Sequence, residues 1–241
     1  MLTINNLFAG YGKVQVLHGI SIEVPKGKVV TLIGSNGAGK TTTMRAVSGM
    51  IAPTAGEISL NGKRIEGLES YHIAKLGLAH SPEGRRVFAT MTVADNLTLG
   101  AFPRLTGSRP KGDVAGDLER ALDLFPRLKE RRLQLAGTLS GGEQQMLAMA
   151  RAIMLNPEVV LLDEPAAGLT APDIKELISI IRKIREHGMT VILIEHHMDV
   201  VMSMCDTVTV LDFGQKIAEG EPAKVQADEK VIEAYLGGTA A

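Results

Sequence analysis

The stretch GSNGAGKT, residues 34–41, decides the fold of this chain, because it fills the pattern G-x-x-x-x-G-K-[ST] of a phosphate-binding loop without a gap. The apolar run Val29–Ile33 precedes it and predicts a buried strand, and the residues from Thr42 to Val47 can begin a helix. Glycines let backbone amides approach phosphate oxygens closely, and the N-terminus of a helix adds positive partial charge. A strand, a loop and a helix in this order predict a site for a nucleoside triphosphate rather than a glycine-rich turn that matches by coincidence.

The last residues of this predicted phosphate loop have separate roles. Lys40 is expected to reach the β- and γ-phosphates, and the hydroxyl of Thr41 is expected to ligate Mg²⁺. The residues expected to contact the nucleotide here are Gly34, Ser35, Asn36, Gly37, Ala38, Gly39, Lys40, Thr41 and Thr42.

The bulk composition is that of an ordinary globular protein. The 241 residues suffice for one large domain or for a core that carries an insertion. A formal net charge of −1 gives no general attraction to nucleic acid or to an anionic membrane. Other residues interrupt the basic cluster Arg127, Lys129, Arg131 and Arg132, so we expect a solvated helix face there rather than a nucleic-acid patch. The single cysteine, Cys205, excludes an internal disulfide bond and is typical of a reducing compartment.

No apolar run approaches the roughly 18 residues that a membrane-spanning helix needs. The longest candidates, residues 159–162 and 191–194, have the length of strands. The first six residues lack both a basic and a long apolar region, so we expect no signal peptide. Any role at a membrane is therefore expected to depend on a partner.

The first third of the chain is predicted to be mostly β structure. Residues 2–4 and 14–24 are rich in β-branched side chains. Residues 57–60 and 63–65 flank the pair Asn61-Gly62, which is a strong hairpin signal. Strands that pair before the phosphate loop, and a hairpin after it, indicate a small antiparallel sheet beside a parallel core.

The middle of the chain, from about Arg85 to Leu155, is predicted to be helical. One helix is expected from Asp117 to Phe125, where apolar residues recur on one face. Residues 104–112 are expected to form a polar loop.

After Pro157, strands and helices are predicted to alternate. A strand is expected at residues 159–162, a helix at Pro172–His187 with Gly188 as its C-terminal cap, and a strand at residues 189–194. Residues 207–211 and 215–218 are expected to form a late hairpin, and residues 237–241 a frayed end.

Two adjacent carboxylates, Asp163 and Glu164, follow the apolar run that begins at Val159. Because neighbouring side chains of a strand point to opposite faces, Asp163 is expected to hold the Mg²⁺ shell while Glu164 turns towards the γ-phosphate and polarises a water. A solvated strand end is the alternative, and the preceding phosphate loop argues against it.

The stretch LSGGEQ, residues 139–144, predicts the start of a helix. Ser140 and Glu143 fit a capping box, and apolar residues follow at helical spacing. Gly141 and Gly142 leave backbone amides open to an anion. From the residues alone, an anion site and a plain helix start remain equally acceptable interpretations.

The same stretch matches letter for letter the signature sequence of ATP-binding-cassette (ABC) proteins, and with the phosphate loop and Asp163-Glu164 the chain resembles that family over nearly its whole length. The resemblance implies an α/β fold: a P-loop NTPase (RecA-like) core with an antiparallel β subdomain and an inserted α-helical subdomain. Residues 1–241 would form one ABC transporter ATP-binding domain, with the core at 1–84 and 156–241 and the helical subdomain at 85–155.

The resemblance also implies a site shared between two subunits. Two domains would pair head to tail, and each ATP would lie between the phosphate loop of one protomer and the signature residues of the other. The signature residues implied to contact ATP are Ser140, Gly141, Gly142 and Glu143.

By the same resemblance, Glu164 and His196 are the catalytic residues, with His196 as the switch histidine at the γ-phosphate. Its neighbour His197 leaves the register of this assignment slightly ambiguous. Tyr11 is at the position where the family has an aromatic that stacks on adenine, although an ordinary surface tyrosine of a strand is the alternative.

The chain departs from the family pattern at two places. Glu83 stands where the family usually has a glutamine that contacts Mg²⁺ and the water; a carboxylate can ligate Mg²⁺, but it donates no hydrogen bond when ionised. The metal ligands implied are therefore Thr41, Asp163 and Glu83. The loop 166–170 replaces a more usual Ser…Leu-Asp pattern, and it is still expected to approach the phosphate loop of the partner.

Four segments resemble the ATP-binding subunits of branched-chain amino-acid importers: residues 82–88, 91–97, 142–148 and 217–237. This resemblance implies an ATPase that powers import of branched-chain or related amino acids with ATP and Mg²⁺. The implied partners are transmembrane permease subunits, which would dock near residues 83–88, and a second ATP-binding subunit, either a second copy or a paralogue. A substrate-binding protein would act indirectly, and no nucleic acid is expected. The implied location is peripheral, on the cytoplasmic face of the inner (plasma) membrane.

Two other functions fit the same cassette. One is the ATPase subunit of an exporter of lipid or lipopolysaccharide, and the other is a soluble ABC ATPase without a transport role. A nucleotide sensor that does not hydrolyse ATP conflicts with the presence of Lys40, Asp163, Glu164 and His196.

Overall fold

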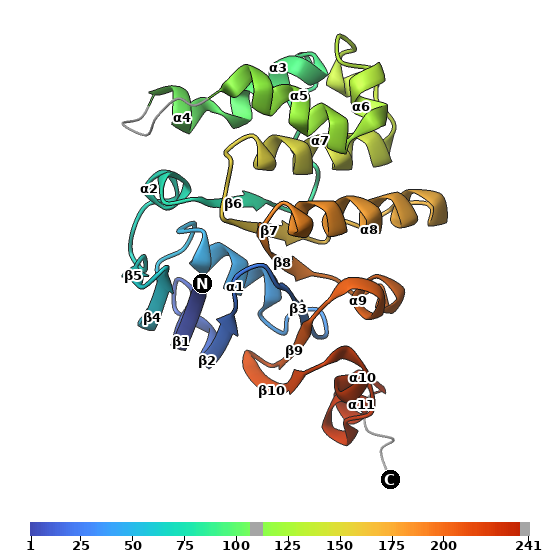
Figure 1. The fold of residues 1–241 in the computed structure, drawn as a ribbon. Coiled ribbons are helices and arrows are strands. Elements are labelled where there is room, and N and C mark those ends of the chain that lie inside the picture. Colours follow the sequence, from blue (N-terminus) through green and yellow to red (C-terminus); the bar gives the residue numbers. More distant parts are fainter. Residues whose placement is uncertain (107–112, 237–241) are drawn as a thin grey trace.

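The structure is a computed structural model that describes residues 1–106 and 113–236, and it contains two sheets and a group of inserted helices (Figure 1). The larger sheet has six strands in the order β10-β9-β3-β8-β7-β6, of which β10 is antiparallel to β9 and the others run parallel. These strands are β3 (Val29–Ile33), β6 (Leu78–Ser81), β7 (Val159–Asp163), β8 (Thr190–Ile194), β9 (Thr207–Asp212) and β10 (Gln215–Gly220).

The central strands of this sheet are covered on both faces. Every residue of β3, β7 and β8 is buried, as expected for parallel strands between two layers. Val160 and Leu162 belong to a core with helices α7 (Gly141–Ile153) and α8 (Ala171–Glu186). Val159 and Leu161 belong to a second core with helix α1 (Lys40–Val47) and the smaller sheet. Alternate side chains of β7 therefore pack against α7 and α8 on one face of the sheet and against α1 and the smaller sheet on the other.

The smaller sheet is antiparallel and has the order β2-β1-β4-β5. Its strands are β1 (Leu2–Tyr11), β2 (Val14–Val24), β4 (Ala55–Leu60) and β5 (Lys63–Arg64). Asn61 and Gly62 form the predicted turn between β4 and β5 with φ of 51° and 75°, as a two-residue hairpin turn requires. The small helix α2 (Ser70–Lys75) then leads to β6.

The inserted helices lie between β6 and β7 in the sequence, and these two strands are neighbours in the larger sheet. The helices are α3 (Val93–Gly100), α4 (Phe102–Thr106), α5 (Val114–Leu124) and α6 (Pro126–Glu130), followed by a short 3-10 turn at Ala136–Thr138 and by α7. Figure 1 shows them stacked on one side of the larger sheet, with α8 between them and the rest of the core.

The chain ends with α9 (Met198–Met204), the hairpin β9–β10, α10 (Pro222–Gln226) and α11 (Glu229–Leu236). Cys205 is a half-buried free thiol, and burial, then Asp206 and Glu195, raise its pKa to about 12. Among the described helices, none has both the length and the hydrophobicity to cross a bilayer.

Most of the predicted elements are confirmed. The strand at 14–24, the late hairpin, and the helix with Pro172 in its first turn and Gly188 after its end are all present. The predicted helical start near Arg85 is wrong, because residues 82–92 contain no helix and Arg85 and Arg86 have φ of 64° and 49°. A loop was predicted at 104–112, but residues 104–106 belong to α4, which ends at Thr106. Residues 107–112 and the predicted frayed end at 237–241 lie outside the described residues.

Candidate nucleotide-binding and hydrolysis site

The phosphate loop lies at the carboxyl end of β3 and leads directly into α1. Gly34 and Gly39 have φ of 153° and 103°. A Cβ at Gly34 would lie 2.2 Å from the carbonyl oxygen of Leu211, and a Cβ at Gly39 would lie 2.5 Å from the Leu17 side chain. Glycine is therefore required at both positions, because the loop is packed tightly against β9 and β2.

Lys40 is the first residue of α1, and its ammonium group lies inside the loop. Its Nζ donates hydrogen bonds to the carbonyl oxygens of Gly34 at 2.8 Å and Ser35 at 3.0 Å. Burial lowers the pKa of Lys40, and the nearby carboxylates of Glu164 and Asp163 oppose this shift. No side chain caps α1, and its first turn contains no acidic residue, so its positive end is available to an anion.

Asp163 ends β7 as a buried carboxylate beside this loop. It is 2% exposed, and its Oδ1 has no hydrogen-bond partner within the part of the chain that the structure describes. Burial, then the negative charges of Glu164 and Glu83, raise the pKa of Asp163 to about 6. An oxygen that is buried, unpartnered and next to other carboxylates fits a cation ligand.

Glu164 follows β7 in a left-handed backbone conformation, with φ of 51°. Its amide donates to the carbonyl oxygen of Ile194 at 3.1 Å, which fixes it beside the end of β8. Strand alternation was the wrong reason for the direction of Glu164, because the residue lies outside the strand. The strained conformation sets the direction of the side chain instead.

His196 follows β8, and its Nδ1 lies 3.9 Å from Oε1 of Glu164. The ring of His197 packs beside that of His196, with the ring centroids 4.8 Å apart.

Glu195, which sequence reasoning did not identify, holds the backbone of the loop that follows β8 and contains His196 and His197. Glu195 is 1% exposed; its Oε2 accepts hydrogen bonds from the amides of His196 and His197, and its Oε1 accepts one from the amide of Ala166. One buried carboxylate thus joins the histidine loop to the loop after Glu164. An acidic residue directly after the apolar strand 190–194 was the available signal.

Glu83 and Tyr11 both lie near Arg45 of α1. Glu83 follows β6, faces a cavity together with Asp163 and Arg45, and contributes to the raised pKa of Asp163. The Tyr11 ring is 41% exposed, and its hydroxyl accepts a hydrogen bond from Nη1 of Arg45 at 3.0 Å. Thr41 and Thr42 are in the first turn of α1. The described residues include no group of three or more His, Cys, Asp or Glu side chains arranged to hold a metal ion.

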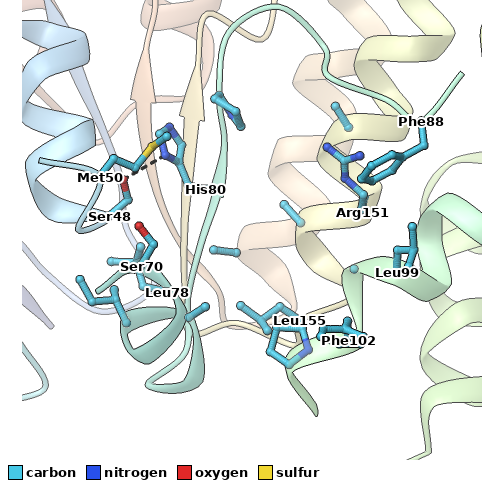
Figure 2. Close-up of a pocket in the computed structure, with 18 residues that line it drawn as sticks. Ser48, Met50, Ser70, Leu78, His80, Phe88, Leu99, Phe102, Arg151 and Leu155 are labelled. Atoms are coloured by element: carbon cyan, nitrogen blue, oxygen red, sulfur yellow. Dashed lines mark hydrogen bonds between the residues drawn. The ribbon is translucent and has the colours of Figure 1, made fainter. Parts of the chain in front are cut away.

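The segment after Glu83 borders an open groove of about 540 Å³ between the core and the inserted helices (Figure 2). Phe88 is half exposed and lies over the guanidinium of Arg151, 5.2 Å from ring centroid to Cζ. Within the described residues, Nη1 of Arg151 and Nε2 of His80 are buried without a hydrogen-bond partner. Burial, then Arg45 and Arg86, lower the pKa of His80 to about 4, so this side chain is neutral near pH 7.

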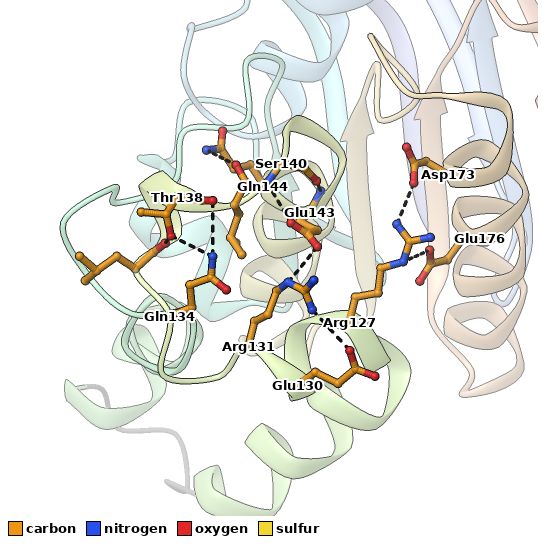
Figure 3. A network of polar contacts seen from close by, with 12 residues as sticks. Arg127, Glu130, Arg131, Gln134, Thr138, Ser140, Glu143, Gln144, Asp173 and Glu176 are labelled. Atoms are coloured by element: carbon orange, nitrogen blue, oxygen red, sulfur yellow. Dashed lines mark hydrogen bonds and ion pairs between the residues drawn. The ribbon is translucent and has the colours of Figure 1, made fainter.

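The signature residues form the start of α7, which follows the inserted helices. Ser140 is the N-cap: its Oγ accepts the amide of Glu143 at 3.2 Å, and Oε2 of Glu143 accepts the amide of Ser140 at 2.8 Å (Figure 3). The predicted capping box is confirmed. A Cβ on Gly142 would lie 3.2 Å from Oδ2 of Asp173, so this start of α7 contacts the start of α8.

Arg85 is a second residue that the sequence analysis missed. A Cβ on Gly141 would lie 2.8 Å from a guanidinium nitrogen of Arg85, so Arg85 packs directly on the signature backbone.

The candidate site residues belong to two groups. Interactions connect Lys40, Asp163, Glu164, Glu83 and His196, and Ser140–Glu143 begin a separate helix. One chain therefore supplies two helix starts, one without a side-chain cap at Lys40 and one closed by the capping box of Ser140 and Glu143.

Two family models match the sequence. One, described as ABC transporter, matches residues 17–167. The other, described as branched-chain amino acid ATP-binding cassette transporter, matches residues 215–241.

Several curated proteins are similar along their whole length. The high-affinity branched-chain amino acid transport ATP-binding protein BraG of Pseudomonas aeruginosa is 43% identical over 99% of this chain and 100% of its own. The protein LivG of Salmonella typhimurium, with the same description, is 35% identical over 98% of both chains.

Solved structures share the fold. A crystal structure of the ADP conformation of MJ1267, an ATP-binding cassette of an ABC transporter, has a TM-score of 0.86 at 29% identity and covers 98% of both chains. A nucleotide-free ATP-binding cassette from an ABC transporter has a TM-score of 0.85 at 29% identity, with 98% of this chain and 99% of that chain covered.

Proposed function

Because this chain belongs to the ATP-binding cassette family of ABC transporter ATPases, we propose that it is the ATP-hydrolysing subunit of a membrane importer for branched-chain or related amino acids. The observation that carries the nucleotide chemistry is that Lys40, Asp163 and Glu164 interact at the start of α1, while the signature residues begin a different helix, α7. Two chains that pair head to tail would bring the two groups together around each ATP. The amino-acid substrate is proposed from the relatives BraG and LivG, which are described as branched-chain amino acid transport proteins.

In this proposal the phosphate loop holds the triphosphate. The backbone amides of residues 34–41 and the positive end of α1 face the phosphate oxygens, and Lys40 exchanges its carbonyl partners for the β- and γ-phosphates. Tyr11 stacks on the adenine, and its exposed ring supports this role.

Mg²⁺ fits the residues at the end of β7. The unpartnered Oδ1 of Asp163 supports a metal ligand there, with Thr41 and Glu83 as the further proposed ligands. When bound, Mg²⁺ would neutralise charge on the phosphates and relieve the cost of burying the Asp163 carboxylate.

Replacing Asp163 by Asn is expected to raise the Mg²⁺ concentration at half-maximal ATPase activity by about 10- to 100-fold, because a neutral amide is a weaker ligand for a hard cation. The measurement is a Mg²⁺ titration at saturating ATP. Asp212→Asn, at the end of β9, is a matched control that should leave the midpoint within about twofold of wild type. An unchanged midpoint in Asp163→Asn would remove this residue from the metal site.

The hydrolytic step is assigned to Glu164 and His196. Glu164 takes the proton of the attacking water, and His196, which lies 3.9 Å from that carboxylate, contacts the γ-phosphate. Glu195 holds the backbone of the His196 loop and so positions this residue.

The groove under Phe88 is proposed as the docking site of a transmembrane permease subunit. It is mainly apolar, and the unpartnered nitrogens of Arg151 and His80 provide hydrogen-bonding groups that an occupant can use. The chain would then lie on the cytoplasmic face of the inner (plasma) membrane, with a second copy or a paralogue as its ATP-binding partner. A substrate-binding protein would act through the permease, and no nucleic acid is involved.

Reconstitution tests this function directly. The chain is purified with its permease subunits and its ATP-binding partner, placed in vesicles, and assayed in the presence of the substrate-binding protein for ATP-dependent uptake of radiolabelled leucine, isoleucine and valine. We expect uptake that stops when ATP is withheld. ATP-dependent movement of lipid out of the vesicle membrane, or stimulation of hydrolysis by nucleic acid without a membrane partner, would contradict the importer proposal.

A further inference from the structure

The starts of α7 and α8 are built in the same way. In α7, Oε2 of Glu143 accepts the amide of Ser140 at 2.8 Å. In α8, Oδ2 of Asp173 accepts the amide of Thr170 at 3.4 Å and also its hydroxyl at 2.6 Å. Each acidic residue is three positions after its N-cap, so one carboxylate oxygen closes the cap and the other oxygen faces outward.

Both of these oxygens are bound by arginines, one in α6 and one directly after its last residue (Figure 3). Arg127 Nη1 lies 2.9 Å from Oδ1 of Asp173, and Arg131 Nε lies 3.1 Å from Oε1 of Glu143. Arg127 also binds Glu176 on α8, with 3.1 Å between Nε and Oε2. The two arginines are four residues apart, one helical turn, so they extend from neighbouring points of α6 and its end.

These arginines belong to the basic cluster for which a solvated helix face was expected. The other two members fit that interpretation, because Lys129 pairs with Asp123 and Arg132 with Glu119, both on α5. Arg127 differs because its partners are on α8, in the core rather than among the inserted helices. The side chains of Asp173 and Glu176 are 17% and 25% exposed and that of Arg127 is 48% exposed, so solvent screens these ion pairs in part.

We propose that Arg127 and Arg131 act as a clamp that fixes the signature start of α7 relative to the loop 166–170 before α8. The clamp rests on the proposed function, in which the signature residues meet the phosphate loop of the partner, and on the expectation that the loop 166–170 approaches the same phosphate loop. The partner can bind both segments at once in one relative position only. Segments that already hold this position lose less conformational entropy when the dimer closes. Arg127 is a positioning residue here, because it acts through Asp173 and Glu176.

The test compares Arg127→Gln with Lys129→Gln. Both remove one cation from α6, but only Arg127→Gln removes contacts to the core. We expect Arg127→Gln to lower ATPase turnover at saturating ATP by about tenfold, because a dimer contains two clamps and the loss of each lowers turnover by about threefold. The affinity of the monomer for ATP should stay within about twofold of wild type. Lys129→Gln should leave both within about twofold. Arg127→Lys should restore part of the turnover, because an ammonium can pair with one carboxylate but lacks the planar fork that binds two.

A distance measurement separates positioning from a general loss of stability. Spin labels at Ala115→Cys on α5 and Lys183→Cys on α8, both exposed positions, are introduced into Cys205→Ala protein. Arg127→Gln should broaden the distribution of label distances in the nucleotide-free monomer, and Lys129→Gln should not. An unchanged distribution in Arg127→Gln would overturn the clamp.

The same variants distinguish this inference from the proposed function. With Arg127 intact, ATP-driven dimerisation of Glu164→Gln protein, assayed alone and with the ATP-binding partner that co-purifies with it, tests the shared site alone, and its absence in both assays would contradict the proposed function. If that dimer forms equally well with Arg127→Gln, the shared site stands and the clamp is overturned. If it forms about tenfold less readily with Arg127→Gln than with Lys129→Gln, the clamp is supported.

Discussion

Glu164→Gln is expected to lower steady-state ATP hydrolysis by about 100- to 1,000-fold while it leaves ATP affinity within about twofold of wild type. Glutamine keeps the size of the side chain but cannot accept the proton of the attacking water. The backbone of Glu164 is left-handed, and its amide is hydrogen-bonded to the carbonyl of Ile194. The substitution changes neither feature, so the glutamine side chain should take the position of the glutamate. Phosphate release at saturating ATP gives the rate, and a fluorescent ATP analogue gives the affinity.

The control for this experiment is Glu186→Gln, an exposed position at the end of α8. It changes the charge by the same amount and should leave both quantities unchanged. Turnover retained within tenfold in Glu164→Gln would show that another group activates the water. His196 would then be the first residue to test, since it is 3.9 Å from Glu164.

Lys40→Ala is expected to weaken ATP binding itself, by about 10- to 100-fold, because it removes charge-assisted hydrogen bonds to the phosphates. The ammonium group is held between the carbonyls of Gly34 and Ser35, so its direction into the loop is fixed before nucleotide binds. Titration with ATP by calorimetry measures the affinity, and thermal unfolding in the absence of ATP checks that the variant is folded.

Lys63→Ala serves as the matched control, because Lys63 is exposed on β5 in the smaller sheet. It should bind ATP as tightly as wild type. Undiminished affinity in Lys40→Ala would contradict the assignment of residues 34–41 as the phosphate loop.

Local patterns predicted the phosphate loop well, because its function and its fold depend on the same short stretch. A buried strand, glycines with positive φ and the start of a helix all follow from residues 29–47. The capping box at Ser140 and the hairpin turn at Asn61-Gly62 are equally local, and both were predicted.

Contacts between distant segments were not predictable in the same way. Glu195 joins the histidine loop to the loop at Ala166 through backbone amides, and nothing in the sequence around Glu195 indicates that Ala166, 29 positions earlier, is its partner. Arg85 packs on Gly141, 56 positions later, only because the chain adopts positive φ after Gly84. Arg127 belonged to a cluster that is correctly described as surface-exposed, yet its carboxylate partners are on α8, at positions 173 and 176.

In the proposed dimer, ATP is enclosed between the phosphate loop of one subunit and Ser140 of another. The most direct measurement is a structure of the Glu164→Gln protein trapped with ATP. We predict a head-to-tail dimer in which the hydroxyl of Ser140 lies within hydrogen-bonding distance of the γ-phosphate bound by the partner. A trapped structure in which Ser140 is remote from every γ-phosphate would contradict the account.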